Sequence, residues 1–249
     1  MADLSLLCVH AHPDDEAIWT GGALARYADA GARTAVVTCT WAEGTRRAEE
    51  LERSLAILGA GAPRLLGYAE ARGTESAPGA PRLLDAPFDE AVGRLVGHIR
   101  EFRPDVVVTY DGYGGYGHPD HLHVHRLTLA AVEAAGYEQL YDGDPWRPRA
   151  LAMATVPRSL VTEIWEELFG TAATGTLPGV PDDQIDTTLD VKPWADRKWA
   201  ALLAHESEIE RGSTMTMLAA LPQAQRDRLL ATEWYIRRDT APGGLRDAF

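Results

Sequence analysis

Cysteine is nearly absent from this sequence, since only Cys8 and Cys39 occur among 249 residues, each inside a stretch typical of a β-strand. Two such residues cannot form the disulfide framework of a small secreted protein, and we interpret both as buried thiols. Long apolar runs are also missing: none reaches the roughly 18 residues of a membrane-spanning helix. Residues 1–5 lack the basic segment that opens a secretory signal peptide. Together these absences favour a cytoplasmic protein that does not enter a membrane.

Positive charge is scarce relative to negative charge. The chain has 24 lysine and arginine residues against 37 aspartate and glutamate residues, which gives a formal net charge of −13. Such a surface repels phosphate backbones, so nucleic acid is not expected as a partner. Apolar residues make up 45% of the chain, which is enough for a sizeable core. These figures indicate a globular protein, and the sequence leaves open whether it forms a homo-oligomer.

The first half of the chain alternates stretches typical of strands with stretches typical of helices. Runs of β-branched and apolar residues predict the strands, and apolar residues at helical spacing predict the helices. Strands are expected at residues 4–9, 34–40, 64–67 and 105–110, and helices at residues 17–30, 46–58 and 88–102. This alternation predicts an α/β fold of the Rossmann-like three-layer α/β/α kind, with a mostly parallel sheet.

The second half of the chain has a weaker pattern. Four further elements are expected there, at residues 150–156 (strand), 159–169 (helix), 194–210 (one long helix) and 233–237 (strand). The simplest interpretation is a single domain over residues 1–249. In it, a catalytic core (1–140) is followed by a smaller C-terminal extension (141–249) that shapes the substrate pocket.

Imidazole and carboxylate groups gather in two loops, each shortly after a predicted strand. The first is HAHPDDE at residues 10–16, and the second is GGYGHPDH at residues 114–121. In open α/β sheets, ligands bind at the carboxyl ends of the strands, where the strand order reverses. If the order is the common 3-2-1-4, the first and fourth strands are neighbours. The two loops then face one another.

These side chains are suited to a divalent cation. A catalytic zinc ion takes three protein ligands from imidazoles and carboxylates and keeps a fourth position open. His12 and Asp15 belong to one loop, while His118 and His121, three residues apart at the start of a helix, can point to the same space. With Asp14, they could supply three ligands, a base and an electrophile. Any one of them alone is more often a helix cap or a surface residue, so the combination carries the prediction.

The two motifs resemble a known family. HPDDE at residues 12–16, GYGHPDH at residues 115–121 and the later His125 resemble the LmbE-like or PIG-L family of zinc-dependent N-deacetylases. That family includes the deacetylase of mycothiol biosynthesis and the mycothiol conjugate amidase. The resemblance is strong from about residue 4 to residue 135 and faint afterwards.

The resemblance implies a metal site and a base. His12, Asp15 and His121 match the family's ligands for Zn²⁺. Asp14 matches the general base that deprotonates a water on the metal. Because Asp14 adjoins a ligand without being one, this assignment agrees with the chemistry that the residues themselves suggest.

The resemblance implies further roles at four positions, and the position of Tyr116 in the sequence suggests a fifth. His118 matches the imidazole that stabilises the oxyanion or protonates the leaving amine, and Asp120 matches the carboxylate that orients and charges it. Arg47 matches an arginine that binds substrate. Glu70 is expected to stand in for an aspartate by which relatives bind the sugar, and Tyr116, between two glycines, is expected to line the pocket.

The implied function is hydrolysis of the acetyl or other acyl group on the amide nitrogen of an N-acetylglucosamine-type sugar or conjugate, a small molecule. One alternative is an amidase acting on a thiol conjugate of the mycothiol type. Two alternatives from other classes are a non-haem iron oxygenase with a two-histidine, one-carboxylate site, and a binding module without catalysis. Neither of these two explains an unligated Asp14. The pattern HESE at residues 205–208 departs from the family's pattern by carrying Glu208 in place of glutamine.

Overall fold

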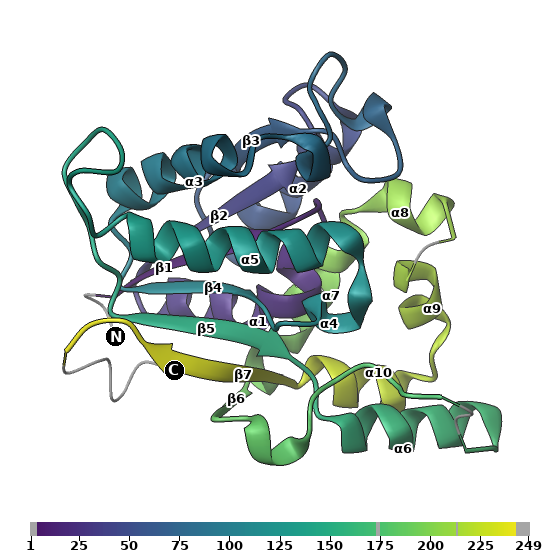
Figure 1. The fold of residues 1–249 in the computed structure, drawn as a ribbon. Coiled ribbons are helices and arrows are strands. Elements are labelled where there is room, and N and C mark those ends of the chain that lie inside the picture. Colours follow the sequence, from purple (N-terminus) through teal and green to yellow (C-terminus); the bar gives the residue numbers. More distant parts are fainter. Residues whose placement is uncertain (1–3, 173–174, 213, 243–249) are drawn as a thin grey trace.

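A sheet of seven strands forms the centre of the protein (Figure 1), whose computed structural model describes residues 4–172, 175–212 and 214–242. The strand order is β3-β2-β1-β4-β5-β7-β6. Neighbouring strands from β3 to β5 are parallel, whereas β7 is antiparallel to both β5 and β6. The bounds are β1 Ser5–His10, β2 Arg33–Thr40, β3 Arg64–Tyr68, β4 Val106–Tyr110, β5 Ala150–Thr155, β6 Thr187–Asp190 and β7 Thr232–Asp239.

Helices cover both faces of this sheet and complete the three layers seen in Figure 1. Helices α1, α2 and α7 pack together on one face, and α3 and α5 pack together on the other. The α-helices are α1 Asp15–Asp29, α2 Arg46–Leu58, α3 Phe88–Phe102, α4 Gly114–Gly117, α5 Pro119–Ala134, α6 Arg158–Phe169, α7 Ala195–Leu203, α8 Glu206–Glu210, α9 Thr214–Ala220 and α10 Gln223–Leu230. Short 3-10 turns lie at Thr74–Ser76, Leu83–Asp85, Asp182–Gln184 and Lys192–Trp194.

The central strands are apolar on both sides because helices cover both sides. In β1, Leu6 and Cys8 pack into the core beneath α1 and α2, while Leu7 and Val9 pack into the core beneath α3 and α5. All four side chains are at most 1% exposed. A strand in this position therefore appears in the sequence as a continuous apolar run.

The predicted α/β fold is confirmed. The sheet contains the expected order β3-β2-β1-β4, and α2 and α3 begin and end at the residues predicted from their apolar spacing. The pattern does not predict β6, because four residues are too few to show alternation. Pairing with β7 holds this segment as a strand.

The expectation of one long helix over residues 194–210 is wrong. The structure has a short turn followed by α7 and α8, with a break at Ala204 and His205. His205 leaves the helical conformation (φ −87°, ψ 61°), and its ring reaches Glu16 of α1 at 2.8 Å. A tertiary hydrogen bond between buried groups therefore outweighs the local helical preference.

The cysteines and the apolar segments can be compared directly with the structure. Cys8 and Cys39 are buried and free, as predicted from their strand positions. Across the described ranges, no helix is long and apolar enough to span a membrane. Burial raises the pKa of both thiols, which keeps them protonated.

The C-terminal part of the chain packs closely against α1 at Gly22. A Cβ atom placed on this glycine would lie only 2.4 Å from Cβ of Val191. The Gly22 N–H donates to Glu233 at 2.7 Å, and Glu233 also pairs with Lys198 at 2.6 Å. Close approach of the Val191 side chain to the α1 backbone, which only glycine permits here, therefore joins α1 to the last third of the chain.

We predict that Gly22→Ala lowers the free energy of unfolding by about 1–3 kcal/mol, because the added methyl group overpacks this contact. Gly97→Ala in α3 is the matched control, since a Cβ there meets no atom within 4 Å. The Gly97→Ala substitution should raise the free energy of unfolding by about 0.5–1 kcal/mol, because alanine is the better helix former. Urea unfolding followed by circular dichroism measures both changes, and equal effects at the two sites would contradict the contact.

Candidate metal-dependent active site

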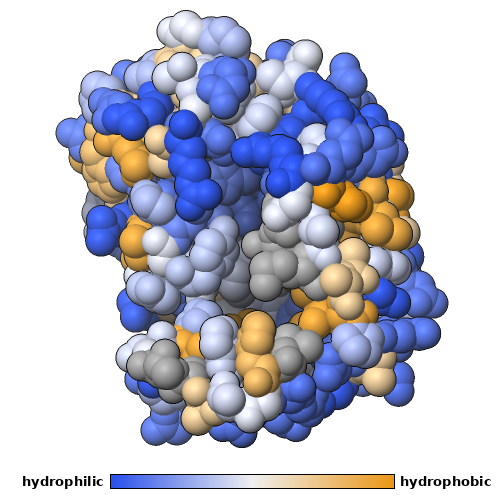
Figure 2. Space-filling model, turned by 90° about the vertical axis from the view of Figure 1, so that its right-hand side faces the viewer, coloured by the Kyte–Doolittle hydropathy of each residue, from blue (hydrophilic) through white to orange (hydrophobic). Residues whose placement is uncertain are grey.

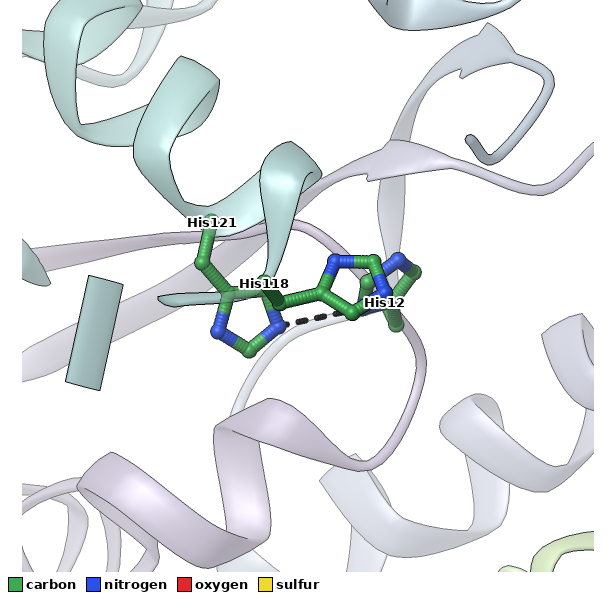
Figure 3. Close-up of side chains that lie close together, drawn as sticks. All are labelled: His12, His118 and His121. Atoms are coloured by element: carbon green, nitrogen blue, oxygen red, sulfur yellow. Dashed lines mark hydrogen bonds between the residues drawn. The ribbon is translucent and has the colours of Figure 1, made fainter. Parts of the chain in front are cut away.

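The two histidine-bearing loops meet at one edge of the sheet. His12 follows β1, and His118 and His121 stand at the start of α5, shortly after β4. Because β1 and β4 are adjacent parallel strands, their carboxyl ends lie side by side. Figure 3 shows the three rings close together, and their potential ligand nitrogens lie within 4.8 Å of one another. The sequence argument for facing loops therefore agrees with the structure.

A tighter triangle includes Asp15 instead of His118. His12 Nδ1 lies 3.2 Å from His121 Nε2, and Asp15 Oδ2 lies 3.4 Å from each of these nitrogens. Zinc bonds of about 2.0–2.1 Å in a tetrahedral site place the ligand atoms roughly 3.3 Å apart. The three-histidine group spreads wider, and His118 Nδ1 already accepts a hydrogen bond from Asp120 N at 3.2 Å. The spacing of His12, Asp15 and His121 fits a small divalent cation better.

Tyr110, the last residue of β4, holds two of the three side chains of this triangle in place. Its hydroxyl donates to Asp15 Oδ2 at 2.7 Å and accepts from Ala11 N at 2.7 Å. Its ring stacks on His121 with 4.2 Å between centroids and 10° between planes. His121 Nδ1 lies 3.1 Å from the carbonyl oxygen of Gly114, which accepts a hydrogen bond from it. That bond leaves Nε2 of His121 directed at Asp15 and His12.

Asp14 has a strained backbone at the entrance to α1. Its φ of 117° is unusual for a residue with a side chain, and its N–H donates to Glu16 Oε2 at 2.9 Å. Burial raises the pKa of the Asp14 carboxyl to about 7, although the nearby Arg47 guanidinium opposes that rise. A buried carboxylate poised near neutral pH is suited to accept a proton.

Arg47 is held by contacts within the protein. Its guanidinium lies 3.1 Å from Asp14 Oδ2 and 3.1 Å from Glu208 Oε1, and it donates to the carbonyl of Pro13. It also lies over the Trp41 ring at 4.8 Å. Arg47 lines the cavity as well, so it can touch a ligand while it orients Asp14.

Asp120 lies closer to His12 than to His118. Its Oδ2 is 3.0 Å from His12 Nε2 and accepts from Ala71 N at 2.9 Å, but it is 4.0 Å from His118 Nδ1. Burial and the neighbouring imidazoles lower the pKa of His118 to about 4. This fall in the His118 pKa is opposite to the rise that a contact with the Asp120 carboxylate would cause. For His12, burial would lower the pKa, but hydrogen bonds to Asp120 and Asp15 raise it to about 10.

A buried network behind Asp14 was not assigned a role from the sequence. Glu16 Oε1 pairs with His205 Nε2 at 2.8 Å and accepts a hydrogen bond from Ser54, and none of these three side chains is exposed. Tyr110 is a second unassigned residue. Glu16 and His205 belong to recognisable motifs, but their separation of 189 positions in the chain hides the pairing. The role of Tyr110 has one signal in the sequence, a polar hydroxyl at the end of an otherwise apolar strand.

A cavity of about 720 Å³ opens over the triangle. His12, Asp14, Asp15, Arg47, Glu70, Tyr116 and His118 all line it, so seven of the nine predicted site residues face this space. The other two, Asp120 and His121, are fully buried behind it. Figure 2 shows the corresponding face of the molecule, with a hollow among mainly hydrophilic residues in its upper half.

Comparison with known proteins identifies the class of this protein. The model of the PIG-L family, described as GlcNAc-PI de-N-acetylase, matches residues 7–132. The chain therefore belongs to the PIG-L family. The resemblance carried by the HPDDE and GYGHPDH motifs, and the enzyme class of deacetylase that it implies, are confirmed.

Individual relatives support the same assignment. The chain is 40% identical to 1D-myo-inositol 2-acetamido-2-deoxy-alpha-D-glucopyranoside deacetylase of Rhodococcus jostii, with 100% of this chain and 96% of that protein covered. It is 41% identical to the protein of the same name from Rhodococcus opacus, over 84% and 83% of the two chains. Among solved structures, a conserved protein from Thermus thermophilus aligns with a TM-score of 0.69 and 25% identity, over 96% of each chain.

We predict that Tyr110→Phe lowers the free energy of unfolding by about 1–3 kcal/mol, because the buried Ala11 N–H loses its acceptor. Tyr137→Phe is the control, since Tyr137 is 45% exposed. That change should stay within about 0.5 kcal/mol of the parent. Urea unfolding of both variants measures the difference. Indistinguishable unfolding curves would show that the Tyr110 hydroxyl does not hold this loop.

Proposed function

We propose that the protein is a zinc-dependent N-deacetylase whose metal is held by His12, Asp15 and His121. The observation that carries this proposal is the triangle of their three atoms, with sides of 3.2, 3.4 and 3.4 Å. Two imidazoles and one carboxylate form the donor set of a catalytic zinc site with one open position. When bound there, zinc supplies an acidic water and a Lewis acid for the amide carbonyl.

Asp14 acts as the general base. It lines the cavity beside the triangle, and its carboxylate is not one of the three groups that form the triangle. Arg47 and the Glu16–His205 pair hold its side chain and backbone in one orientation. A fixed base of this kind takes the proton of the attacking water without reorganising at the moment of reaction.

His118 acts on the opposite side of the reacting carbonyl. It lines the cavity, and its ring lies 4.7 Å from the His12 ring, edge to face. A donor at this place can stabilise the negative oxygen that forms when the amide carbon becomes tetrahedral. The departing amine nitrogen then takes up the proton that Asp14 removed from the attacking water. Asp120 holds the His12 ring through its carboxylate at 3.0 Å and the His118 ring through its backbone N–H at 3.2 Å.

The substrate is an N-acetylglucosamine-type sugar, in line with the names of the relatives, which are deacetylases of an inositol-linked acetamido sugar. Arg47, Glu70 and Tyr116 line the cavity and offer charged and hydroxyl groups for sugar hydroxyls. The volume of about 720 Å³ lies within the range of sites for a sugar conjugate.

The chain is one domain in which the C-terminal extension, residues 141–249, shapes the substrate pocket. Val156, Pro178, Glu208 and Arg211 line the same cavity as the motif residues. The extension also adds β5, β6 and β7 to the central sheet, so it shares one core with residues 1–140.

Family membership does not favour the iron oxygenase, because the matching family and relatives are deacetylases. The described contacts provide no specific observation in favour of a thiol-conjugate amidase. We therefore keep a single function.

The metal assignment predicts different outcomes at two neighbouring histidines. His121→Ala should abolish stoichiometric zinc, because it removes one of three ligands. His118→Ala should retain about one zinc per chain while hydrolysis falls by about 10²–10³. Metal analysis after dialysis and assays on N-acetylglucosamine conjugates measure both. Equal loss of zinc in the two variants would overturn the ligand set.

The base assignment predicts that Asp14→Asn keeps its zinc and loses activity by about 10²–10⁴, since a carboxamide cannot accept the proton. Chelation of the parent should abolish the same activity, and added zinc should restore it. Loss of zinc from Asp14→Asn would instead make Asp14 a ligand.

A further inference from the structure

A second, smaller cavity adjoins the active-site cavity. It has a volume of about 120 Å³ and is predominantly apolar, with Leu202, Leu229, Leu230 and Trp234 among its lining residues. We call it the apolar annex. Its walls come from α7, α10 and β7, elements of the C-terminal extension, together with residues of α1, β5 and α9.

The two charged groups in the annex wall are already paired. Lys198 Nζ lies 2.6 Å from Glu233 Oε1, and both residues are at most 3% exposed. Glu233 also accepts hydrogen bonds from the N–H groups of Gly22 and Ala23 and from the hydroxyl of Tyr235. These groups therefore have their hydrogen-bond partners within the protein and do not need a polar ligand.

The annex and the active-site cavity share a boundary of four side chains. Ile18, Trp19, Val156 and Leu218 line both spaces. Ile18 and Trp19 lie one turn beyond Asp15 on α1, so this boundary starts close to the ligand triangle. The two spaces are therefore neighbours, and apolar side chains form the boundary between them.

The walls of the active-site cavity differ in polarity. Charged side chains line it from α2, from the loop after β3 and from the segment at α8, namely Arg47, Glu70, Arg72, Glu208 and Arg211. The apolar boundary side chains come from α1, from the end of β5 and from α9 instead. A substrate with a polar sugar on one side of its amide bond and an alkyl group on the other matches this division.

We propose that the apolar annex binds the acyl chain of the substrate and that the enzyme hydrolyses N-acyl sugars with acyl groups longer than acetyl. This inference rests on the proposed amide hydrolysis and adds the chemical class of the group removed. The charged walls hold the sugar, the acyl carbon lies at the ligand triangle, and the alkyl tail enters the annex.

The annex volume sets the chain length. An apolar cavity of about 150 Å³ holds one benzene ring, so about 120 Å³ accommodates roughly four or five carbon atoms. Added to the two carbons of an acetyl group, this gives an optimum near hexanoyl. Each methylene that enters the annex is worth about fourfold in binding, whereas a longer chain no longer fits.

The first experiment is a chain-length series with the zinc-loaded enzyme, using N-acetyl-, N-butanoyl-, N-hexanoyl- and N-decanoylglucosamine. We expect kcat/KM to rise at least tenfold from acetyl to hexanoyl and to fall again at decanoyl. A steady decline from acetyl onward overturns the proposal. If no member of the series is hydrolysed, the proposed function fails, and the binding measurements below still test the annex.

The second experiment fills the annex. Leu229→Trp places a larger side chain in it, and Thr232→Phe does so from β7 in case the first variant does not fold. Either variant should lower the hexanoyl-to-acetyl ratio of kcat/KM at least tenfold. Ala224→Trp, at an exposed position on the same helix α10, is the matched control and should leave the ratio unchanged.

Calorimetric titration of the metal-free protein separates binding from turnover. The parent should bind N-hexanoylglucosamine at least tenfold more tightly than N-acetylglucosamine, and the filled variants should lose this difference. Equal affinities in the parent, or a preference that survives in both filled variants, would show that the acyl chain lies elsewhere.

Discussion

The adjacency of β1 and β4 is the constraint on which the rest of the structure depends. Two parallel strands that are neighbours in the sheet but about 100 residues apart in the chain end at the same edge. The loop after β1 carries His12, Asp14 and Asp15, and the start of α5 carries His118 and His121. Helices on both faces bury the strands, so neither loop can move away without exposing the core.

A cluster of buried acids and imidazoles is costly to assemble, and this fold offsets the cost by pairing its members. Asp15 receives hydrogen bonds from Tyr110 and from the backbone of His12, and Glu16 pairs with His205. Unpaired, each carboxylate would lose several kcal/mol of hydration. The strained backbone of Asp14 persists because Glu16 and Arg47 hold it on two sides.

The C-terminal part of the chain completes both the sheet and the site. Gly22 admits Val191 at a distance that no other residue would allow, and His205 reaches α1 from the break between α7 and α8. The same region supplies the charged Glu208 on one side of the cavity and the apolar wall of the annex on the other. In the function proposed here, selectivity for the sugar and for the acyl chain thus depends on residues beyond the segment 7–132 that the family model matches.

The sequence alone determined the α/β class and the two loops that carry the imidazoles and carboxylates, whereas the order of the first four strands was assumed from the common pattern and then found in the structure. The class and the two loops follow from local patterns, since apolar runs predict buried strands and spaced imidazoles and carboxylates predict a cation site. Only the tertiary structure decided that Tyr110 supports Asp15, that Asp120 contacts His12 more closely than His118, and that the helix expected over residues 194–210 breaks at His205. Each depends on a contact between side chains far apart in the chain or on small differences in distance, which no local pattern encodes.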